Sequence, residues 1–154
     1  MKLILTFILL AFATAVAAQT PGLKVAFNVL EDQKTDNYDV YTVGTDGSSL
    51  TNVTRHKDVA WTYYSIPGKL LFISDRDACK RCYFLYEADL DGSNIRKISN
   101  LQLEDSWMGS RNNGSELIVS GRIGTTIRFQ LFIIERETGR FQQITKDLES
   151  AFRD

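Results

Sequence analysis

The chain has 154 residues, of which 44% are hydrophobic and 24% are charged, and its formal net charge is −1. This length provides for one domain, and the ordinary composition argues against a disordered chain. The balanced charge argues against a basic surface for nucleic acid or an anionic membrane, so we expect neither partner.

Residues 1–18 are typical of a secretory signal peptide. Lys2 gives a short positive region, Leu3–Leu10 is almost unbroken apolar sequence, and small residues close the segment. This pattern predicts cleavage after Ala17 or Ala18 and a secreted protein, or a periplasmic one in a Gram-negative bacterium. A membrane anchor needs about 20 apolar residues, whereas this run stops before Gln19, so we expect no stable membrane insertion.

The remaining sequence, 19–154, repeats itself with a nearly constant step. With a step of 45, the matches are Phe27 and Phe72, Tyr41 and Tyr86, Asp46-Gly47 and Asp91-Gly92, Leu50 and Ile95, and Thr54 and Ser99. With a step of 46, a third copy matches Trp61 to Trp107, Gly68 to Gly114, Ser74 to Ser120, Arg76 to Arg122, Tyr86 to Phe132 and Ser99 to Thr145. The three copies span about 24–54, 59–99 and 105–145, and such a period is typical of a repeat architecture.

Each copy predicts short strands joined by tight turns. In the second copy the predicted strands are Trp61–Tyr64, Lys69–Ser74, Tyr83–Tyr86 and Ile95–Ser99. Asp91-Gly92 predicts a hairpin turn, because glycine accepts the positive φ that such turns need. The two middle strands are apolar on both faces, which predicts sheets stacked face to face around an axis.

These motifs resemble the TolB-type, WD40-like propeller repeat. That pattern runs from an aromatic-Ser-Pro-Asp-Gly-Lys turn to a strand ending Phe-x-Ser-x-Arg, and then to an Ile-Tyr strand, an Asp-Gly-Ser turn and a closing Leu-Thr. The second copy supplies Tyr64–Lys69, Phe72–Arg76, Tyr86, Asp91-Gly92-Ser93 and Ile98-Ser99; the third, more divergent copy supplies Asn112-Asn113-Gly114, Ser120-Gly121-Arg122 and Ile144-Thr145. The resemblance implies an all-β propeller with about three four-stranded antiparallel blades, which is half of a six-bladed ring.

The two ends of the repeat region are incomplete in complementary ways. The first copy starts at Lys24 without room for its own first strand, and residues 148–153 look like the first strand of a further blade. Two interpretations remain open. A truncated propeller is the one we put first; the second is a homodimer in which two chains complete a six-bladed ring.

No set of catalytic residues stands out, so we expect a protein that is not an enzyme and needs no cofactor. His56 lies between two cations and no G-x-S-x-G motif accompanies it, which favours a solvated loop histidine over a hydrolase triad. Cys79 and Cys82 lack the extra ligands of a zinc site and the helix of a redox motif. A disulfide across this loop, worth about 2 kcal/mol at best, is the remaining use. Asp89–Gly92 resembles part of a calcium loop, but a hairpin turn explains it better.

Two further features bear on function. Asn52 and Asn113 begin N-glycosylation sequons, which matter only in a eukaryotic secretory pathway. A group of aromatic residues can either form a binding surface or pack between blades: Trp61, Tyr63, Tyr64 and Trp107. The function most consistent with the resemblance is a secreted binding or scaffold module for a protein, peptide or glycan. The alternatives are the gating propeller of a secreted serine peptidase and a truncated copy without function.

Overall fold

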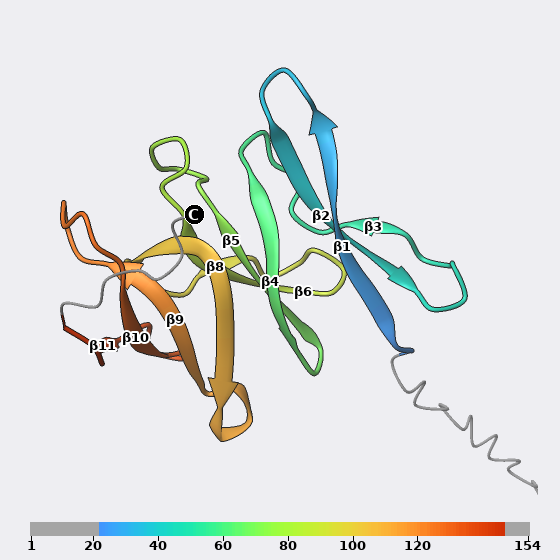
Figure 1. The fold of residues 1–154 in the computed structure, drawn as a ribbon. Helices are drawn as coiled ribbons and strands as arrows, with labels where there is room; N and C mark the ends of the chain where they lie inside the picture. Colours follow the sequence, from blue (N-terminus) through green and yellow to red (C-terminus); the bar gives the residue numbers. More distant parts are fainter. Residues whose placement is uncertain (1–21, 147–154) are drawn as a thin grey trace, which may run out of the picture.

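The computed structural model describes residues 22–146, in which every regular element except one short 3-10 turn is a β-strand. The strands form three antiparallel sheets that follow one another along the chain, and Figure 1 shows them as successive blades. This architecture confirms the predicted all-β fold of about three blades. Within the described range no helix is long and apolar enough to cross a membrane.

Blade 1 has three strands in sequence order: β1 (Lys24–Asp32), β2 (Asn37–Gly44) and β3 (Thr51–Asn52). Phe27 and Tyr41 lie opposite each other in the β1–β2 ladder, and their rings stack with centroids 6.0 Å apart. Within residues 22–146 this blade has no counterpart of the first strand of the other two blades, so no described strand pairs with the outer edge of β1.

Blade 2 has four strands, also in sequence order: β4 (Ala60–Ile66), β5 (Lys69–Ser74), β6 (Phe84–Asp89) and β7 (Arg96–Lys97). The β5–β6 ladder places Phe72 opposite Tyr86, with ring centroids 5.6 Å apart. Because Phe72 and Tyr86 repeat Phe27 and Tyr41 one step later, blades 1 and 2 have the same internal register.

Blade 3 repeats the order of blade 2 and contains the 3-10 turn. Its elements are β8 (Gln102–Arg111), η1 (Asn112–Gly114), β9 (Glu116–Arg122), β10 (Gln130–Glu135) and β11 (Phe141–Gln143). β8 carries an irregularity between Leu103 and Met108, where its pairing with β9 shifts register. In this blade Val119 and Phe132 are the opposed pair.

One glycine closes the turn before the last strand of each blade. Gly47, Gly92 and Gly139 have φ values of 82°, 84° and 70°, which other residues adopt only with strain. In the first two turns the preceding aspartate, Asp46 or Asp91, accepts a hydrogen bond from the backbone of the serine that follows the glycine. These turns are the hairpin turns predicted from the Asp-Gly pairs.

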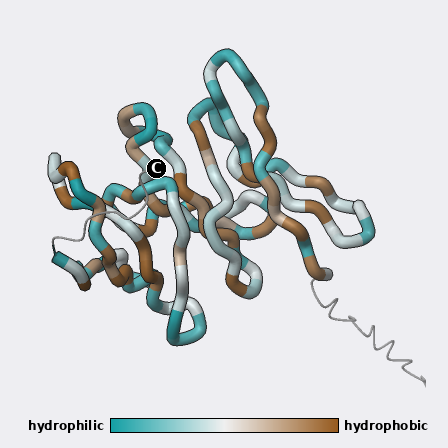
Figure 2. The backbone as a smooth tube through the Cα atoms, viewed as in Figure 1, coloured by the Kyte–Doolittle hydropathy of each residue, from teal (hydrophilic) through white to brown (hydrophobic). Residues whose placement is uncertain are grey.

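Two apolar clusters join the blades. Between blades 1 and 2, Val40 packs with Phe72 and Tyr86; between blades 2 and 3, Leu85 packs with Phe132. Figure 2 shows hydrophobic residues along the strands and hydrophilic residues at most hairpin tips. The core is therefore made between sheets, as stacked blades require.

The prediction that the middle strands are buried on both faces holds in blade 2 and is wrong for the outer blades. In β5 every residue after Lys69 is buried, whereas β10 alternates and leaves Leu131 and Ile133 half-buried. In β1, Val25 and Phe27 are exposed. The reason is physical: within residues 22–146, blade 2 has a neighbour on each side, and blades 1 and 3 each have one.

Candidate binding surface on the inner strands

The first strands of blades 2 and 3 lie side by side at one edge of the stacked sheets. The hydroxyl oxygen of Tyr63 on β4 lies 3.2 Å from the carbonyl oxygen of Glu104 and 3.1 Å from that of Trp107, both on β8. Ser110 of β8 donates a hydrogen bond of 2.8 Å to the hydroxyl oxygen of Tyr64. These contacts make β4 and β8 the inner strands, with β7 and β11 at the opposite edges of their sheets.

The four aromatic residues predicted from the sequence divide into two groups. Trp61 packs on Tyr38 with ring centroids 4.1 Å apart, and Tyr63 is held as described above. Burial raises the pKa of Tyr63, so it stays a neutral donor at physiological pH. Trp107, by contrast, is 51% exposed. The structure therefore assigns Trp61, Tyr63 and Tyr64 to packing and hydrogen bonding, and leaves Trp107 open to solvent.

The indole of Trp61 has one further property. Its Nε1 atom is buried, and it has no hydrogen-bond partner among the described residues. A buried N–H without an acceptor costs stability, and a ligand or ordered water would satisfy it. The hydroxyl of Ser106 on β8 is likewise buried without a partner among the described residues, so the inner strands offer one exposed aromatic ring and two unsatisfied polar groups.

Charged side chains from the three blades lie near the inner strands. Arg81 forms an ion pair with Asp36 of blade 1 and donates a 3.0 Å hydrogen bond to the hydroxyl oxygen of Tyr83. Asp105 lies on β8 and is exposed overall, but desolvation of its carboxyl raises its pKa, an effect that the charge of Arg81 opposes. Arg81 of blade 2, Asp36 of blade 1 and Asp105 of blade 3 therefore form what we call the charged rim of the inner strands.

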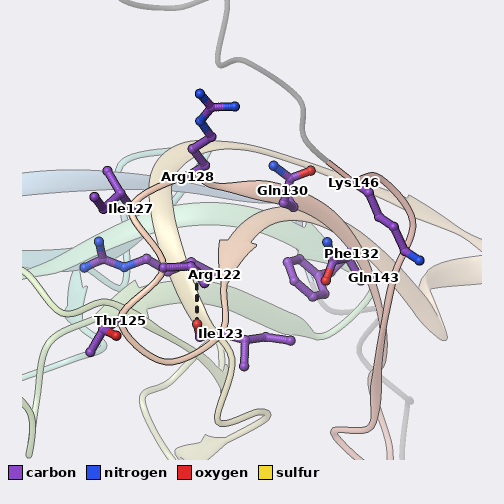
Figure 3. Close-up of a pocket in the computed structure, with 10 residues that line it drawn as sticks. Arg122, Ile123, Thr125, Ile127, Arg128, Gln130, Phe132, Gln143 and Lys146 are labelled. Atoms are coloured by element: carbon purple, nitrogen blue, oxygen red, sulfur yellow. Dashed lines mark hydrogen bonds between the residues drawn. The ribbon is translucent and has the colours of Figure 1, made fainter.

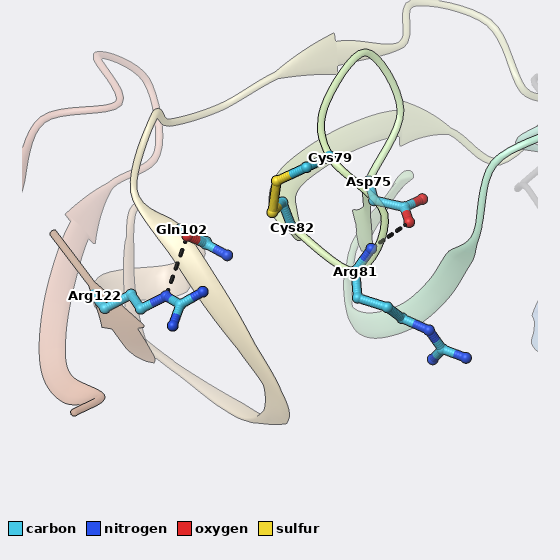
Figure 4. The surroundings of a disulfide bond; sticks show 6 residues. All are labelled: Asp75, Cys79, Arg81, Cys82, Gln102 and Arg122. Carbon is cyan, nitrogen blue, oxygen red and sulfur yellow. Dashed lines mark hydrogen bonds between the residues drawn. A yellow bond between two sulfur atoms is a disulfide. The ribbon is translucent and has the colours of Figure 1, made fainter. Parts of the chain in front are cut away.

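A disulfide-closed loop positions Arg81, as Figure 4 shows. Cys79 and Cys82 are bonded in the structure, with Cα atoms 5.2 Å apart. The buried carboxylate of Asp75 accepts hydrogen bonds from the backbone N–H groups of Arg81, at 2.8 Å, and Val59, at 2.9 Å. Asp75 thereby ties the loop between β5 and β6 to the segment that leads into β4.

Comparisons with known proteins identify the fold. No family model matches the chain, and no curated protein matches it in sequence. Among solved structures, TolB from Acinetobacter baumannii superposes with a TM-score of 0.62 at 16% identity, over 80% of this chain and 31% of that chain. A putative TolB from Agrobacterium tumefaciens gives 0.57 at 14% identity, over 78% of this chain and 44% of that chain. The fold is that of a TolB-like β-propeller.

The tricorn protease contains a similar arrangement of blades. Its structure superposes with a TM-score of 0.51 at 19% identity, over 75% of this chain and 10% of that chain. The chain thus spans less than half the length of each of these three solved chains. At such identities the likeness concerns the fold alone.

The histidine of this TolB-like propeller is held in a polar loop. His56 is half-buried rather than fully solvated, and its Nδ1 atom lies 3.1 Å from Asp58. Its backbone N–H donates to Asp39, and its carbonyl oxygen accepts from Asn37. Sequence neighbours alone indicated an environment of two cations, whereas the fold adds carboxylates. Its contacts are those of a loop anchor.

The two sequon asparagines differ in their surroundings. The side chain of Asn52 donates to Asp39 and accepts from the backbone of Arg55, so its amide is engaged. Asn113 is exposed at the tip of the 3-10 turn, with a φ of 55°. Glycosylation remains a prediction, and Asn113 is the more accessible acceptor.

An open hollow of about 630 Å³ lies at the end of blade 3, shown in Figure 3. Arg122, Arg128 and Lys146 are three basic residues of its wall, and Ile127 is 83% exposed beside it. Arg122 is engaged with its own blade, over the ring of Phe129 and hydrogen-bonded to Gln102. Sequence reasoning did not single out this hollow, because its walls come from segments on both sides of β10.

Proposed function

We propose that this TolB-like propeller is a secreted binding or scaffold module with no catalytic activity of its own. It holds a protein, peptide or glycan partner on the surface formed by β4 and β8. The fold supports this proposal, since propellers present rigid surfaces built from short strands and loops. The predicted signal peptide at residues 1–18, which lies outside the described residues, supports the proposed secretion.

The observation that carries the proposal is the exposure of Trp107 on β8, beside an inner strand, β4, whose aromatic residues are all engaged. A large aromatic ring on a rigid strand gives contact area at little entropic cost, and tryptophan is enriched among residues that dominate binding energy. Glu104 and Asp105 lie on the same strand as this ring, and the charge of Arg81 acts on the carboxyl of Asp105. Such a mixture of aromatic and acidic groups favours a peptide segment with basic or polar side chains.

Panning a random peptide-display library and probing a glycan array with the purified full chain test the proposal. We expect binders that the Trp107→Ala variant loses, because the substitution removes the exposed ring without touching the core. Phe141→Ala is the matched control, since Phe141 is 39% exposed on β11, at the opposite edge of its blade. Binding that survives Trp107→Ala but not Phe141→Ala would contradict the assignment of the surface.

The similarity to the tricorn protease favours one second candidate, the propeller part of a secreted peptidase. The gene sequence that follows codon 154 distinguishes the two candidates, because a peptidase requires a catalytic serine motif such as G-x-S-x-G in the same reading frame. The third alternative, a truncated copy without function, predicts a product that fails to unfold in one cooperative transition.

A further inference from the structure

Blades 1 and 3 each present one face that no other blade covers within residues 22–146. The internal repeat allows each residue on these faces to be compared with its equivalent in an interface between two blades. We call the side of a blade that bears the opposed pair Phe72 and Tyr86, or its equivalent, the front face, and the other side the back face. The back face of blade 1 packs on the front face of blade 2, and the back face of blade 2 on the front face of blade 3. Within residues 22–146 the front face of blade 1 and the back face of blade 3 are left without a blade.

The first repeated contact is apolar. Val40 on the back face of blade 1 and Leu85 on that of blade 2 are both fully buried against the next blade. One step further, the equivalent residue is Leu131, which is half-buried. The front-face pair that would receive it, Phe27 and Tyr41, is stacked in the same way as the buried pair of blade 2.

The second repeated contact joins a glycine turn to a backbone carbonyl. A Cβ atom on Gly92 would lie 2.8 Å from the carbonyl oxygen of Val53, and one on Gly139 would lie 2.0 Å from that of Ile98. Each turn therefore fits closely against the preceding blade. The equivalent glycine of blade 1, Gly47, has nothing within 4 Å of such an atom, and the equivalent carbonyl belongs to Ile144, whose side chain is 50% exposed.

A third contact, polar and observed at the interface between blades 1 and 2, involves a charged side chain. Arg76 of blade 2 donates a 3.0 Å hydrogen bond to the carbonyl oxygen of Thr54 in blade 1. The repeat places Glu31 at the position of Arg76 on the uncovered front face, and Thr145 at the position of Thr54 on the uncovered back face. Lys146 follows Thr145 directly, so the acidic residue of one end is matched by a basic residue at the other.

We propose that a second copy of this chain covers these faces, with the back face of blade 3 in one copy docked on the front face of blade 1 in the other. Both junctions form together under two-fold symmetry, which closes the assembly instead of extending it into a filament. Two copies of three blades make six, within the four to eight blades that closed propellers contain. The two junctions would bury the exposed apolar residues Val25, Phe27 and Ile144.

The solution mass of the full chain, purified and measured by light scattering over a range of concentrations, tests the proposal. We expect twice the monomer mass, and a return to monomer mass for Leu131→Glu and for Gly47→Asn, because asparagine tolerates the positive φ but adds a side chain at the junction. Lys80→Glu introduces the same side chain in an exposed loop of blade 2, the middle blade, and is expected to remain dimeric. Circular dichroism melts of each variant verify that it is folded.

Mixing the two monomeric variants tests the head-to-tail arrangement. Leu131→Glu blocks the back face and Gly47→Asn blocks the front face, so the mixture retains one intact junction and is expected to form a heterodimer. Glu31→Lys is expected to weaken the dimer, and Lys146→Glu in the same chain to restore it. A monomer at every concentration, a dimer that both blocking substitutions leave intact, or a mixture that stays monomeric would overturn the proposal.

Discussion

Blades 1 and 2 present the same aromatic pair in the same register, yet only one pair lies in a core. Phe72 is fully buried and Tyr86 is buried, whereas Phe27 is 37% exposed and Tyr41 is half-buried. Their ring geometries are similar, with centroids 5.6 Å apart in blade 2 and 6.0 Å in blade 1. The sequence of a blade therefore sets the pairing of its side chains, while the neighbouring blade determines whether that pairing stabilises the fold.

The largest expected difference is between Phe72→Ala and Phe27→Ala. Truncating the fully buried ring of Phe72 removes its apolar contacts and leaves a cavity, so we expect the free energy of unfolding to fall by about 3 to 5 kcal/mol. Under dilute, monomeric conditions Phe27→Ala is expected to cost about 1 kcal/mol, because much of that ring already contacts water. Urea-induced unfolding followed by tryptophan fluorescence measures both values.

The difference between the costs of these two substitutions is also expected to depend on protein concentration. If a second copy covers blade 1, the cost of Phe27→Ala increases as the wild-type chain dimerises, while the cost of Phe72→Ala keeps its dilute value. Equal costs for the two substitutions in the dilute monomer would contradict the assignment of Phe27 to an uncovered face.

The polar contacts between neighbouring blades also differ: blades 2 and 3 are joined by ion pairs, and blades 1 and 2 by a neutral hydrogen bond at the equivalent position. Between blades 2 and 3, buried Glu87 receives hydrogen bonds from Arg96, at 3.2 Å, and from Arg136, at 2.9 Å. At the equivalent position between blades 1 and 2, Thr42 donates a neutral 2.8 Å hydrogen bond to the carbonyl oxygen of Leu90.

We expect Glu87→Ala to lower the free energy of unfolding by about 3 kcal/mol, because it leaves the largely buried guanidinium of Arg136 without its main anionic partner. Thr42→Ala is expected to cost about 1 kcal/mol, as a single neutral hydrogen bond is lost. Chemical denaturation of the two variants under the same conditions gives the comparison. A larger loss from Thr42→Ala would show that the ion pairs are not what holds blade 3.

The glycine turns provide a smaller but closely matched test. Gly92→Ala and Gly47→Ala introduce the same positive-φ strain of about 1 kcal/mol. Only at Gly92 does the new methyl group also meet a backbone carbonyl, that of Val53, so we expect a total loss of about 2 to 4 kcal/mol there. The difference in melting temperature between the two variants reports the contact with the preceding blade, and equal shifts would show that this contact yields at no cost.

Elements that depend on local pattern are predictable from this sequence. The apolar run Lys69–Ser74 coincides with β5, and the Asp-Gly pairs form the turns at Gly47 and Gly92. Each of these features is encoded within a few residues and repeated in the next copy, so three copies reinforce one interpretation.

Contacts between loops of different blades are not predictable in this way. Arg81 follows Lys80 in a loop that reads as solvated, yet its partner Asp36 lies one blade earlier. That contact depends on the path of the disulfide-closed loop, which Asp75 fixes through backbone hydrogen bonds. The exposure of Trp107 likewise depends on which face of β8 its neighbours cover. The candidate binding surface was therefore predicted as a set of aromatic residues, without its charged rim.

The smallest expected effect concerns Asp89 at the last turn of blade 2. Its repeat equivalent in blade 1 is Gly44, which has no carboxyl to titrate. A hydrogen bond and ion pair with Lys69, together with a hydrogen bond from Asn94, hold the pKa of Asp89 below its ordinary value of 3.8. Because the folded-state pKa is depressed, the stabilisation is present above pH 3.8 and is lost as the pH falls through the folded value. We expect Lys69→Met to raise the pKa of Asp89 in an NMR titration of the side-chain carboxyl. Asp46, whose pKa is lowered by Ser48, serves as an internal control that Lys69→Met leaves unchanged; a parallel rise at both aspartates would mean that the substitution disturbs the fold and not one contact.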